Sequence, residues 1–300
     1  MKKCLIKMAA FVVLLWVVDM LVGVGCRFFQ NRAQGGDTGR MNYIADQMEE
    51  EVLVFGSSRA IHHYDPRILA DSLGMSCYNC GRDGNGIIFC YGQYRLFRDR
   101  YVPRIIIYDI YPPFDLAEQK DNEKYLAWLR YFYDREGIDS IFWDVDTAER
   151  WKMRSMMRRY NEKFIQIVSD AYSPRQEDID GYRPLAGTVD YEVKKESDKT
   201  QEGFRYDTLK MEYWRKLVAD CKARGTRLVF AVSPIYHGGQ ISTFEPLREL
   251  AKKEGIPFLY HYGDSVFLGK GGYFNDGAHL NGDGAEAFTK LIVSEIKKCF

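Results

Sequence analysis

Five short runs of mainly aliphatic and aromatic residues recur along the 300-residue chain, with helical patterns between them. Runs of this length are typical of strands buried in a parallel sheet. Strands that alternate with helices form a parallel sheet whose two faces are both covered. The sequence therefore predicts an α/β fold, a three-layer α/β/α sandwich around a five-stranded parallel sheet. The expected strands are residues 51–55, 75–79, 104–108, 227–232 and 257–260.

Helical spacing of apolar residues accompanies these strands, and glycines mark two of the helix ends. Gly225 and Gly255 each follow a periodic segment, at the place where a residue without a Cβ readily closes a helix in the left-handed conformation. The final helix is expected from Asp283 onward, with apolar residues on one face. The other helices expected in the body are residues 87–98, 207–224 and 243–253.

The N-terminal segment has the composition of a membrane anchor. Three lysines precede the run Met8–Gly25, which is apolar apart from Asp19 and just long enough to cross a bilayer. Basic residues before the run predict a cytoplasmic N-terminus and an exported body. A cleaved signal peptide is the alternative, and Gly23-Val24-Gly25-Cys26 faintly resembles a lipoprotein cleavage site. An acid inside the span either contacts another helix or reaches the interface.

The remaining chain divides by composition. Residues 1–26 are expected to be the cytoplasmic tip and transmembrane signal-anchor, 27–50 a polar linker, and 51–300 the folded body. Residues of about 115–205 break the strand–helix rhythm, with helical pieces near 122–133 and 146–168. We expect this mostly helical insertion to form a cap above the carboxyl ends of the strands, where open α/β folds bind ligands.

Two features of composition exclude whole classes of partner. The chain has 42 basic and 42 acidic side chains, so it lacks the net positive field that favours nucleic acid. Cys77-x-x-Cys80 has the spacing of half a zinc site or a redox pair, but no second pair with matching spacing accompanies it. We therefore expect no metal and no cofactor.

Two short motifs far apart in the sequence carry the chemistry. Ser58 follows the first strand, and Asp276 and His279 lie three residues apart in a glycine-containing loop before the last helix. A serine hydroxyl becomes a useful nucleophile when an imidazole takes its proton and a carboxylate orients that imidazole. Each motif alone also fits an ordinary turn, helix cap or surface loop. Together they favour acyl-transfer chemistry.

These motifs resemble the sequence blocks of a known superfamily. Gly56-Ser57-Ser58-Arg59, Asn79-Cys80-Gly81 and Asp276-Gly277-Ala278-His279-Leu280-Asn281 look like the first, second and fifth blocks of the SGNH/GDSL hydrolases. The resemblance covers residues 50–300 apart from the insertion, and it implies a flavodoxin-like sheet. The membrane anchor and the Gly-Ser-Ser form of the first block look most like the branch that acylates envelope polymers, by teichoic-acid D-alanylation or alginate O-acetylation.

The resemblance also implies a role for each matching residue. Ser58 would be the nucleophile, His279 the general base and then acid, and Asp276 its orienting partner. The backbone N–H groups of Ser58 and Gly81 would form the oxyanion hole. The family's third block normally adds an asparagine there, but directly after the third strand this chain reads Asp109-Ile110-Tyr111-Pro112-Pro113, without an asparagine.

Other polar residues near these motifs have two readings each. Asn85 is our candidate to replace the missing asparagine, with an ordinary turn as the alternative. Arg59 either binds an anionic or polyhydroxyl substrate or forms a structural salt bridge. We expect His62 and His63 on a helix surface, although both could line the cleft. His237 and His261 are fallback bases, and Asp109 is either a buried carboxylate or a site residue.

The sequence thus predicts a serine-dependent esterase or O-acyltransferase. It would act through an acyl-enzyme on ester groups of a cell-envelope polysaccharide or glycolipid, with a membrane-bound acyl-donor protein as an additional partner. The alternative is a catalytically degenerate domain of the same fold that binds glycan or a membrane partner without turnover. The missing third-block asparagine motivates that alternative.

Overall fold

The computed structural model describes residues 1–120, 122–172, 178–193 and 204–299 of the chain. These residues belong to two compact units. One, which we call the helical unit, comprises residues 1–48, 95–97 and 121–176. The other, the sheet unit, comprises residues 49–94, 98–120 and 177–300. Within the insertion predicted at about 115–205, residues 121, 173–177 and 194–203 lie outside the described residues.

The sheet unit is built on a five-stranded parallel sheet of order β2-β1-β3-β4-β5. This order is the flavodoxin-like one, in which the first strand lies inside the sheet and the second at its edge. All five expected strands are present, each within two residues of its predicted bounds, which confirms the predicted sheet. The strands are β1 (Val52–Gly56), β2 (Cys77–Asn79), β3 (Ile105–Asp109), β4 (Arg227–Val232) and β5 (Phe258–Tyr260).

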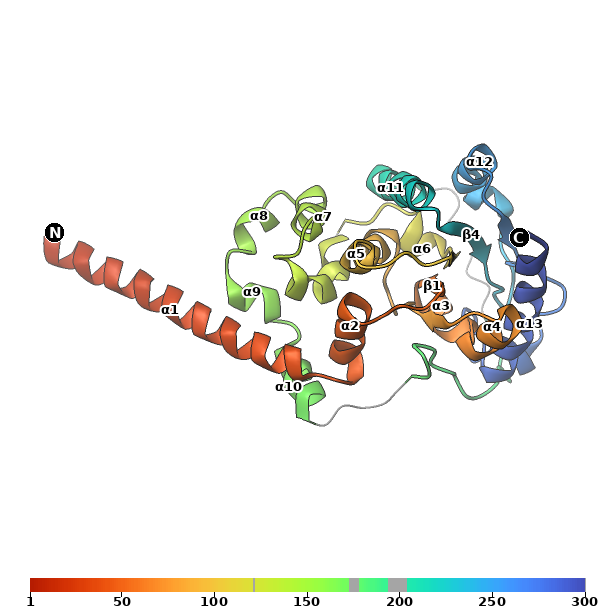
Figure 1. The fold of residues 1–300 in the computed structure, drawn as a ribbon, viewed down its shortest axis with the longest axis horizontal. Coiled ribbons are helices and arrows are strands. Elements are labelled where there is room, and N and C mark those ends of the chain that lie inside the picture. Colours follow the sequence, from red (N-terminus) through yellow and green to blue (C-terminus); the bar gives the residue numbers. More distant parts are fainter. Residues whose placement is uncertain (121, 173–177, 194–203, 300) are drawn as a thin grey trace. The chain divides into compact units, whose positions relative to one another are not determined.

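Alternate side chains of each strand face opposite layers of helices. On one face Val54 and Ile107 share a core with Phe288 and Ile292 of the last helix. On the other face the ring of Trp214 lies 4.4 Å from that of Tyr108, a contact between the sheet and the helix that precedes β4. The first layer contains α3 (Ser58–His63), α4 (Pro66–Leu73) and α13 (Gly282–Cys299), and the second contains α5 (Ile87–Phe97) and α11 (Thr208–Arg224) (Figure 1). The predicted three-layer sandwich is confirmed.

The helix boundaries follow local sequence signals. The Asp207 side chain accepts hydrogen bonds from the N–H groups of Leu209 and Lys210 and so caps the start of α11. Gly225 closes α11 with φ of 79°, and Gly255 closes α12 (Glu245–Glu254) with φ of 69°. Both predicted glycine caps are confirmed. The remaining short elements of this unit are α6 (Pro112–Asp115), η3 (Ile241–Phe244) and η4 (Gly271–Tyr273).

The helical unit contains one long apolar helix and several short ones. α1 (Lys2–Arg32) is long and apolar enough to cross a membrane, a property it shares with signal sequences. The other elements are α2 (Gly36–Asp46), η1 (Asn122–Phe132), α7 (Ile138–Val145), α8 (Glu149–Lys152), α9 (Met156–Tyr160) and α10 (Phe164–Tyr172).

Two expectations about this unit need correction. The polar segment 27–50, expected to be a linker, is mostly helical, because α1 continues to Arg32 and α2 buries Met41 and Ile44. The helix expected over 146–168 is three short helices, since Ser155 caps a new helix by accepting from the Arg158 N–H. The position of the insertion above the strands stays a prediction.

Candidate active site

The turn that presents Ser58 is set by a glycine at the end of β1. Gly56 has φ of 139°, a conformation that side chains with a Cβ rarely adopt. A Cβ added at this position would lie 2.6 Å from the carbonyl oxygen of Asp109 on the neighbouring strand. Ser57 is the residue before α3 and makes no side-chain cap hydrogen bond, and Ser58 is the first helical residue. The nucleophile candidate therefore stands at the carboxyl edge of the sheet, partly exposed.

Ser58, His279 and Asp276 lie in one hydrogen-bonded chain. The Ser58 Oγ is 2.8 Å from His279 Nε2, and His279 Nδ1 is 2.9 Å from Asp276 Oδ2 and 3.0 Å from its Oδ1. Because an ionised carboxylate only accepts, Nδ1 carries the hydrogen and Nε2 is left to accept the serine hydroxyl. This is the tautomer that general-base activation of a serine requires.

The loop around His279 keeps the Asp276 carboxylate ionised. Its Oδ1 accepts the backbone N–H groups of Ala278 at 2.8 Å and of His279 at 2.9 Å. Burial acts to raise the pKa of Asp276, but these hydrogen bonds and the imidazole outweigh it and hold that pKa below the ordinary aspartate value. The loop itself is a tight hairpin, in which the Asn275 N–H donates to the His279 carbonyl at 2.9 Å. His279 and Asp276 thus lie together on one short hairpin loop.

A buried polar network ties this loop to the helix that carries Ser58. The N–H of Leu280, next to the base, donates to His63 Nε2 at 3.0 Å. His63 Nδ1 in turn donates to the Ser233 hydroxyl at 2.9 Å, and that hydroxyl donates to Asp109 Oδ2 at 3.1 Å. Burial and the nearby positive charge of Arg59 hold the pKa of His63 well below its ordinary value, so this imidazole is neutral. His63 was expected on a helix surface and is fully buried instead.

Arg59 occupies the centre of the same network. Its side chain is completely buried, with Nε 3.5 Å from Asp109 Oδ2 and 3.0 Å from the Ser233 hydroxyl. The guanidinium also lies over the rings of Tyr111 and Tyr262, at 5.0 and 5.2 Å. Of the two readings of Arg59, the structure has the salt bridge, because a side chain without exposed surface cannot meet a substrate. Asp109 is correspondingly a buried sheet-edge carboxylate.

The predicted oxyanion donors differ in whether their N–H groups already donate a hydrogen bond within the protein. Ser58 is the first residue of α3, where a backbone N–H has no partner within the helix. The Gly81 N–H donates to the side-chain oxygen of Asn79 at 2.9 Å, so an oxyanion would have to share it. The Asn85 amide nitrogen donates to the Asp83 carbonyl at 2.7 Å. Gly81 is needed for packing too, since a Cβ there would lie 2.5 Å from the backbone nitrogen of Ile61.

The other histidines are accounted for by local partners. His62 lies edge-to-face with His279 at 5.7 Å, and its Nε2 is 3.2 Å from an Asp83 oxygen, so it lines the site although a helix-surface position was expected. His237 Nε2 is 2.7 Å from the Val193 carbonyl, and His261 lies between Asp264 and Glu295. Within the described residues, no group of three His, Cys, Asp or Glu side chains is placed to hold a metal ion.

Sequence reasoning missed Ser233 and the role of His63. The available signal was position alone, because His63 follows the nucleophile on the same short helix and Ser233 comes directly after β4. Side chains at the carboxyl ends of neighbouring strands share one sheet edge. Nothing in the sequence pairs either residue with Leu280.

Comparisons with known proteins add likenesses in fold. No protein-family model and no curated protein matches the sequence. Solved structures similar to this one include a protein assigned as an acylhydrolase from Bacteroides fragilis NCTC 9343, at 14% identity and TM-score 0.38, covering 84% of this chain and 89% of that one. A GDSL-like lipase from Bacteroides thetaiotaomicron has 12% identity and TM-score 0.38, with 83% and 88% covered. An acetyl xylan esterase has 11% identity and TM-score 0.39, with 82% and 99% covered.

Proposed function

We propose that the protein is a serine-dependent esterase or O-acyltransferase that works through an acyl-enzyme on Ser58. The observation that carries the proposal is the continuous chain from the Ser58 hydroxyl through His279 to the Asp276 carboxylate. The arrangement supplies a nucleophile, a base of the required tautomer and an acid that stabilises the imidazolium. The resemblance of the surrounding motifs to SGNH/GDSL hydrolases supports the same reaction class.

In this mechanism each proton has a defined route. Ser58 Oγ attacks the ester carbonyl carbon while its proton passes to His279 Nε2, and the carbonyl oxygen becomes an oxyanion. The ester C–O bond then breaks, and His279 returns the proton to the leaving alkoxide. Water or a second hydroxyl attacks the acyl-enzyme, gives its proton to His279, and releases the acyl group from Ser58, which regains its hydrogen. Hydrolysis and transfer differ only in this second nucleophile.

The site offers two backbone N–H groups as donors to the oxyanion, and one of them is already engaged. The Ser58 N–H at the start of α3 is one donor, and the Gly81 N–H is a second that is shared with Asn79. Loss of one oxyanion donor typically lowers the rate by about 100- to 1000-fold. We therefore expect slow turnover of activated esters relative to hydrolases with a full set of donors.

The setting of the substrate follows from α1. We propose that α1 anchors the protein in a membrane with the catalytic unit on the exported side, as the preceding lysines favour. An anchored esterase site fits acylated polysaccharide or glycolipid of the cell envelope. A membrane-bound protein would then supply the acyl group if transfer is the reaction.

Turnover of p-nitrophenyl acetate by the purified full-length protein tests the assignment. Ser58→Ala should lower kcat/KM by on the order of 10⁴-fold or more, because the nucleophile is removed. Ser57→Ala is the matched control: among the described residues, its buried hydroxyl has no hydrogen-bond partner, so its loss should leave most of the activity. Equal turnover by wild type and Ser58→Ala would refute the proposal.

The shared Gly81 N–H also favours a second candidate, a domain that binds glycan or a membrane partner without turnover. Labelling with a fluorophosphonate probe separates the two. An enzyme should be labelled at Ser58, and His279→Ala should abolish that labelling. Glycan binding that persists in Ser58→Ala and His279→Ala, without labelling of the wild type, would establish the second candidate.

A further inference from the structure

The long helix α1 packs against the insertion through one stripe of residues. Asp19, Gly23, Cys26 and Gln30 recur every three or four positions and so lie on one side of α1. Gly23 allows close approach, since a Cβ there would lie 2.4 Å from that of Met156 on α9. Figure 1 shows α9 and α10 beside the C-terminal half of α1, and none of the labelled helices and strands lies beside its N-terminal half. The insertion therefore accompanies α1 from Asp19 onward.

Asp19 fixes this packing by capping α9. Its carboxylate accepts the Ser155 hydroxyl at 2.6 Å and the N–H groups of Met156 and Met157 at 2.7 and 2.9 Å. Those N–H groups belong to the first turn of α9 and have no partner within that helix. The Asp19 carboxylate thus has hydrogen-bond donors, and the first N–H groups of α9 have an acceptor. The alternative of a helix contact, raised by the sequence, is the one observed.

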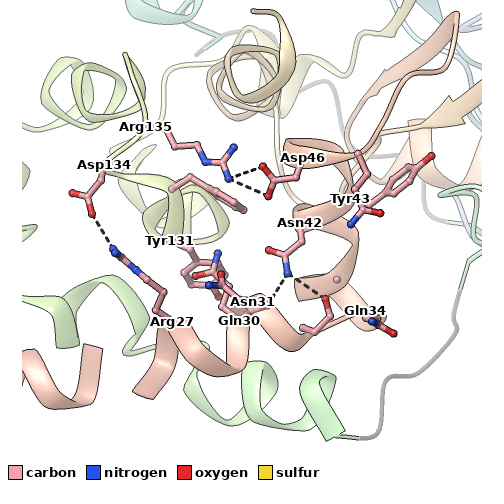
Figure 2. Close-up of a pocket in the computed structure, with 14 residues that line it drawn as sticks. Arg27, Gln30, Asn31, Gln34, Asn42, Tyr43, Asp46, Tyr131, Asp134 and Arg135 are labelled. Carbon is pink, nitrogen blue, oxygen red and sulfur yellow. Dashed lines mark hydrogen bonds and ion pairs between the residues drawn. The ribbon is translucent and has the colours of Figure 1, made fainter. Parts of the chain in front are cut away.

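The polar boundary of α1 lies near Arg27. A polar cavity of about 740 Å³ begins there, lined mainly by side chains of α1, α2 and η1 (Figure 2). Arg27 pairs with Asp134 at 3.0 Å on its wall, and Arg135 pairs with Asp46 at 2.8 Å. Such a charged and amide-rich lining belongs at the level of water or lipid headgroups.

This boundary sets the depth of Asp19. Residues 8–26 number 19 and rise about 29 Å as a helix, close to the roughly 30 Å of bilayer hydrocarbon. Asp19 precedes Arg27 by eight residues, or about 12 Å. A span that ended before Asp19 would have only residues 4–18, about 22 Å, and would still put Asp19 at the interface. In the first placement the first turn of α9 lies in the outer half of the hydrocarbon, and in the second it lies at the interface.

The insertion exposes apolar side chains in this region. We call Trp151, Met157, Phe164, Ile165 and Tyr172 the insertion's apolar surface; they are between 45% and 83% exposed. The guanidinium of Arg154 lies 4.2 Å from the Trp151 ring centre, a pairing suited to the headgroup level. The Glu149 carboxylate beneath them is buried and paired with Arg158 at 3.0 Å. The buried charge of Glu149 is thus compensated by a partner within the protein.

We propose that the insertion's apolar surface contacts lipid in the outer leaflet of the same bilayer that α1 spans. The partner is the lipid itself, and the inference rests on the proposed anchor role of α1. A single helix can rotate about its own axis in a membrane, whereas a second lipid contact beside it fixes that rotation. The helical unit would thus hold one defined face toward the bilayer, at the depth of lipid-linked substrates.

Environment-sensitive fluorophores on single cysteines test this in the full-length protein reconstituted in phosphatidylcholine nanodiscs. The exposed Cys4 and Cys299 are first replaced by serine, and the five buried cysteines are kept. Probes are attached at Met157→Cys and, independently, at Ile165→Cys. Leu14→Cys on the bare part of α1 and the exposed Lys252→Cys on α12 serve as lipid and water references. For each label, we measure how strongly a lipid-borne nitroxide and a water-soluble ion quench the fluorescence.

Labels at positions 157 and 165 should resemble that at position 14, with blue-shifted emission and several-fold stronger quenching by the lipid-borne nitroxide than at position 252. If the label at position 14 is quenched by the lipid-borne nitroxide but those at positions 157 and 165 behave like that at 252, α1 is an anchor and the proposed lipid contact of the insertion is overturned. If label 14 itself behaves like 252, the anchor and the inference fail together. Exposed positions are used throughout, so the substitutions leave the core intact.

Discussion

His63 offers a sharp test of how the loop that carries His279 is held in place. Its Nε2 accepts the Leu280 N–H at 3.0 Å, and its Nδ1 donates to the Ser233 hydroxyl at 2.9 Å. Two amide residues divide these bonds between them. His63→Asn places an amide nitrogen near the Nδ1 position and keeps the bond to Ser233. His63→Gln reaches the Nε2 position and keeps an acceptor for Leu280.

The expected magnitudes follow from what each variant leaves unpaired. In His63→Asn the buried Leu280 N–H loses its acceptor, which costs about 1–3 kcal/mol and frees the loop beside His279. A displacement of the base by about 1 Å can lower the rate by up to about 100-fold. In His63→Gln the Ser233 hydroxyl loses one donor but keeps Arg59 and Asp109 as partners, at a cost of about 1 kcal/mol.

Steady-state kinetics on p-nitrophenyl acetate, beside urea unfolding of each variant, checks this reasoning. We expect His63→Asn to lower kcat by about 10- to 100-fold with KM nearly unchanged, since the residue acts through the loop and not through substrate. His63→Gln should keep most of kcat. The reasoning is refuted if the two variants lose kcat equally, or if the losses simply follow the losses in unfolding free energy.

Three further predictions concern the pKa of His63, the turn at Gly56 and the Arg59–Asp109 ion pair. Because His63 has a native pKa well below 6.5, the unfolded chain binds a proton below pH 6.5 that the native state does not. The free energy of unfolding should therefore decrease as the pH is lowered below 6.5, by up to about 1.4 kcal/mol per pH unit. Urea unfolding of His63→Gln should lack this contribution to the slope, and equal slopes for the two proteins would contradict it. Gly56→Ala should cost at least about 2 kcal/mol through strain and the contact with Asp109. Gly74→Ala, in open space with φ of 65°, should cost less, and equal melting temperatures of the two would be contrary evidence. Arg59→Met should cost about 3–5 kcal/mol, because the buried Asp109 carboxylate keeps its hydrogen bonds from Tyr64 and Ser233 but loses its cationic partner. Asp109→Asn in the same chain should restore part of this loss, as thermal unfolding of both variants would measure.

The sequence determined the sheet unit well because its signals are local. Apolar runs of strand length, such as Ile105–Ile107, exclude most alternatives to buried parallel strands. The caps at Asp207 and Gly225 depend on the conformation of one or two residues, and such preferences act before any tertiary contact forms. The helical unit was less predictable: Met41 and Ile44 are buried because tertiary partners cover them, and their surroundings in the sequence are polar.

The chemistry shows the same division. Ser58, Asp276 and His279 were candidates from residue type, order and spacing alone, since a serine nucleophile needs a base and the base needs an orienting acid. Ser58 and His279 are 221 positions apart in the sequence, and their meeting at hydrogen-bond distance is a property of the fold.

Only the tertiary structure decided what surrounds that chain of three. It buried Arg59 against Asp109, made His63 a neutral link to Leu280, and gave Asp19 a partner in α9. The physical reason is that a hydrogen bond depends on position within a few tenths of an ångström. Residue types specify which bonds are feasible, and the packing of strands and helices selects the ones that form.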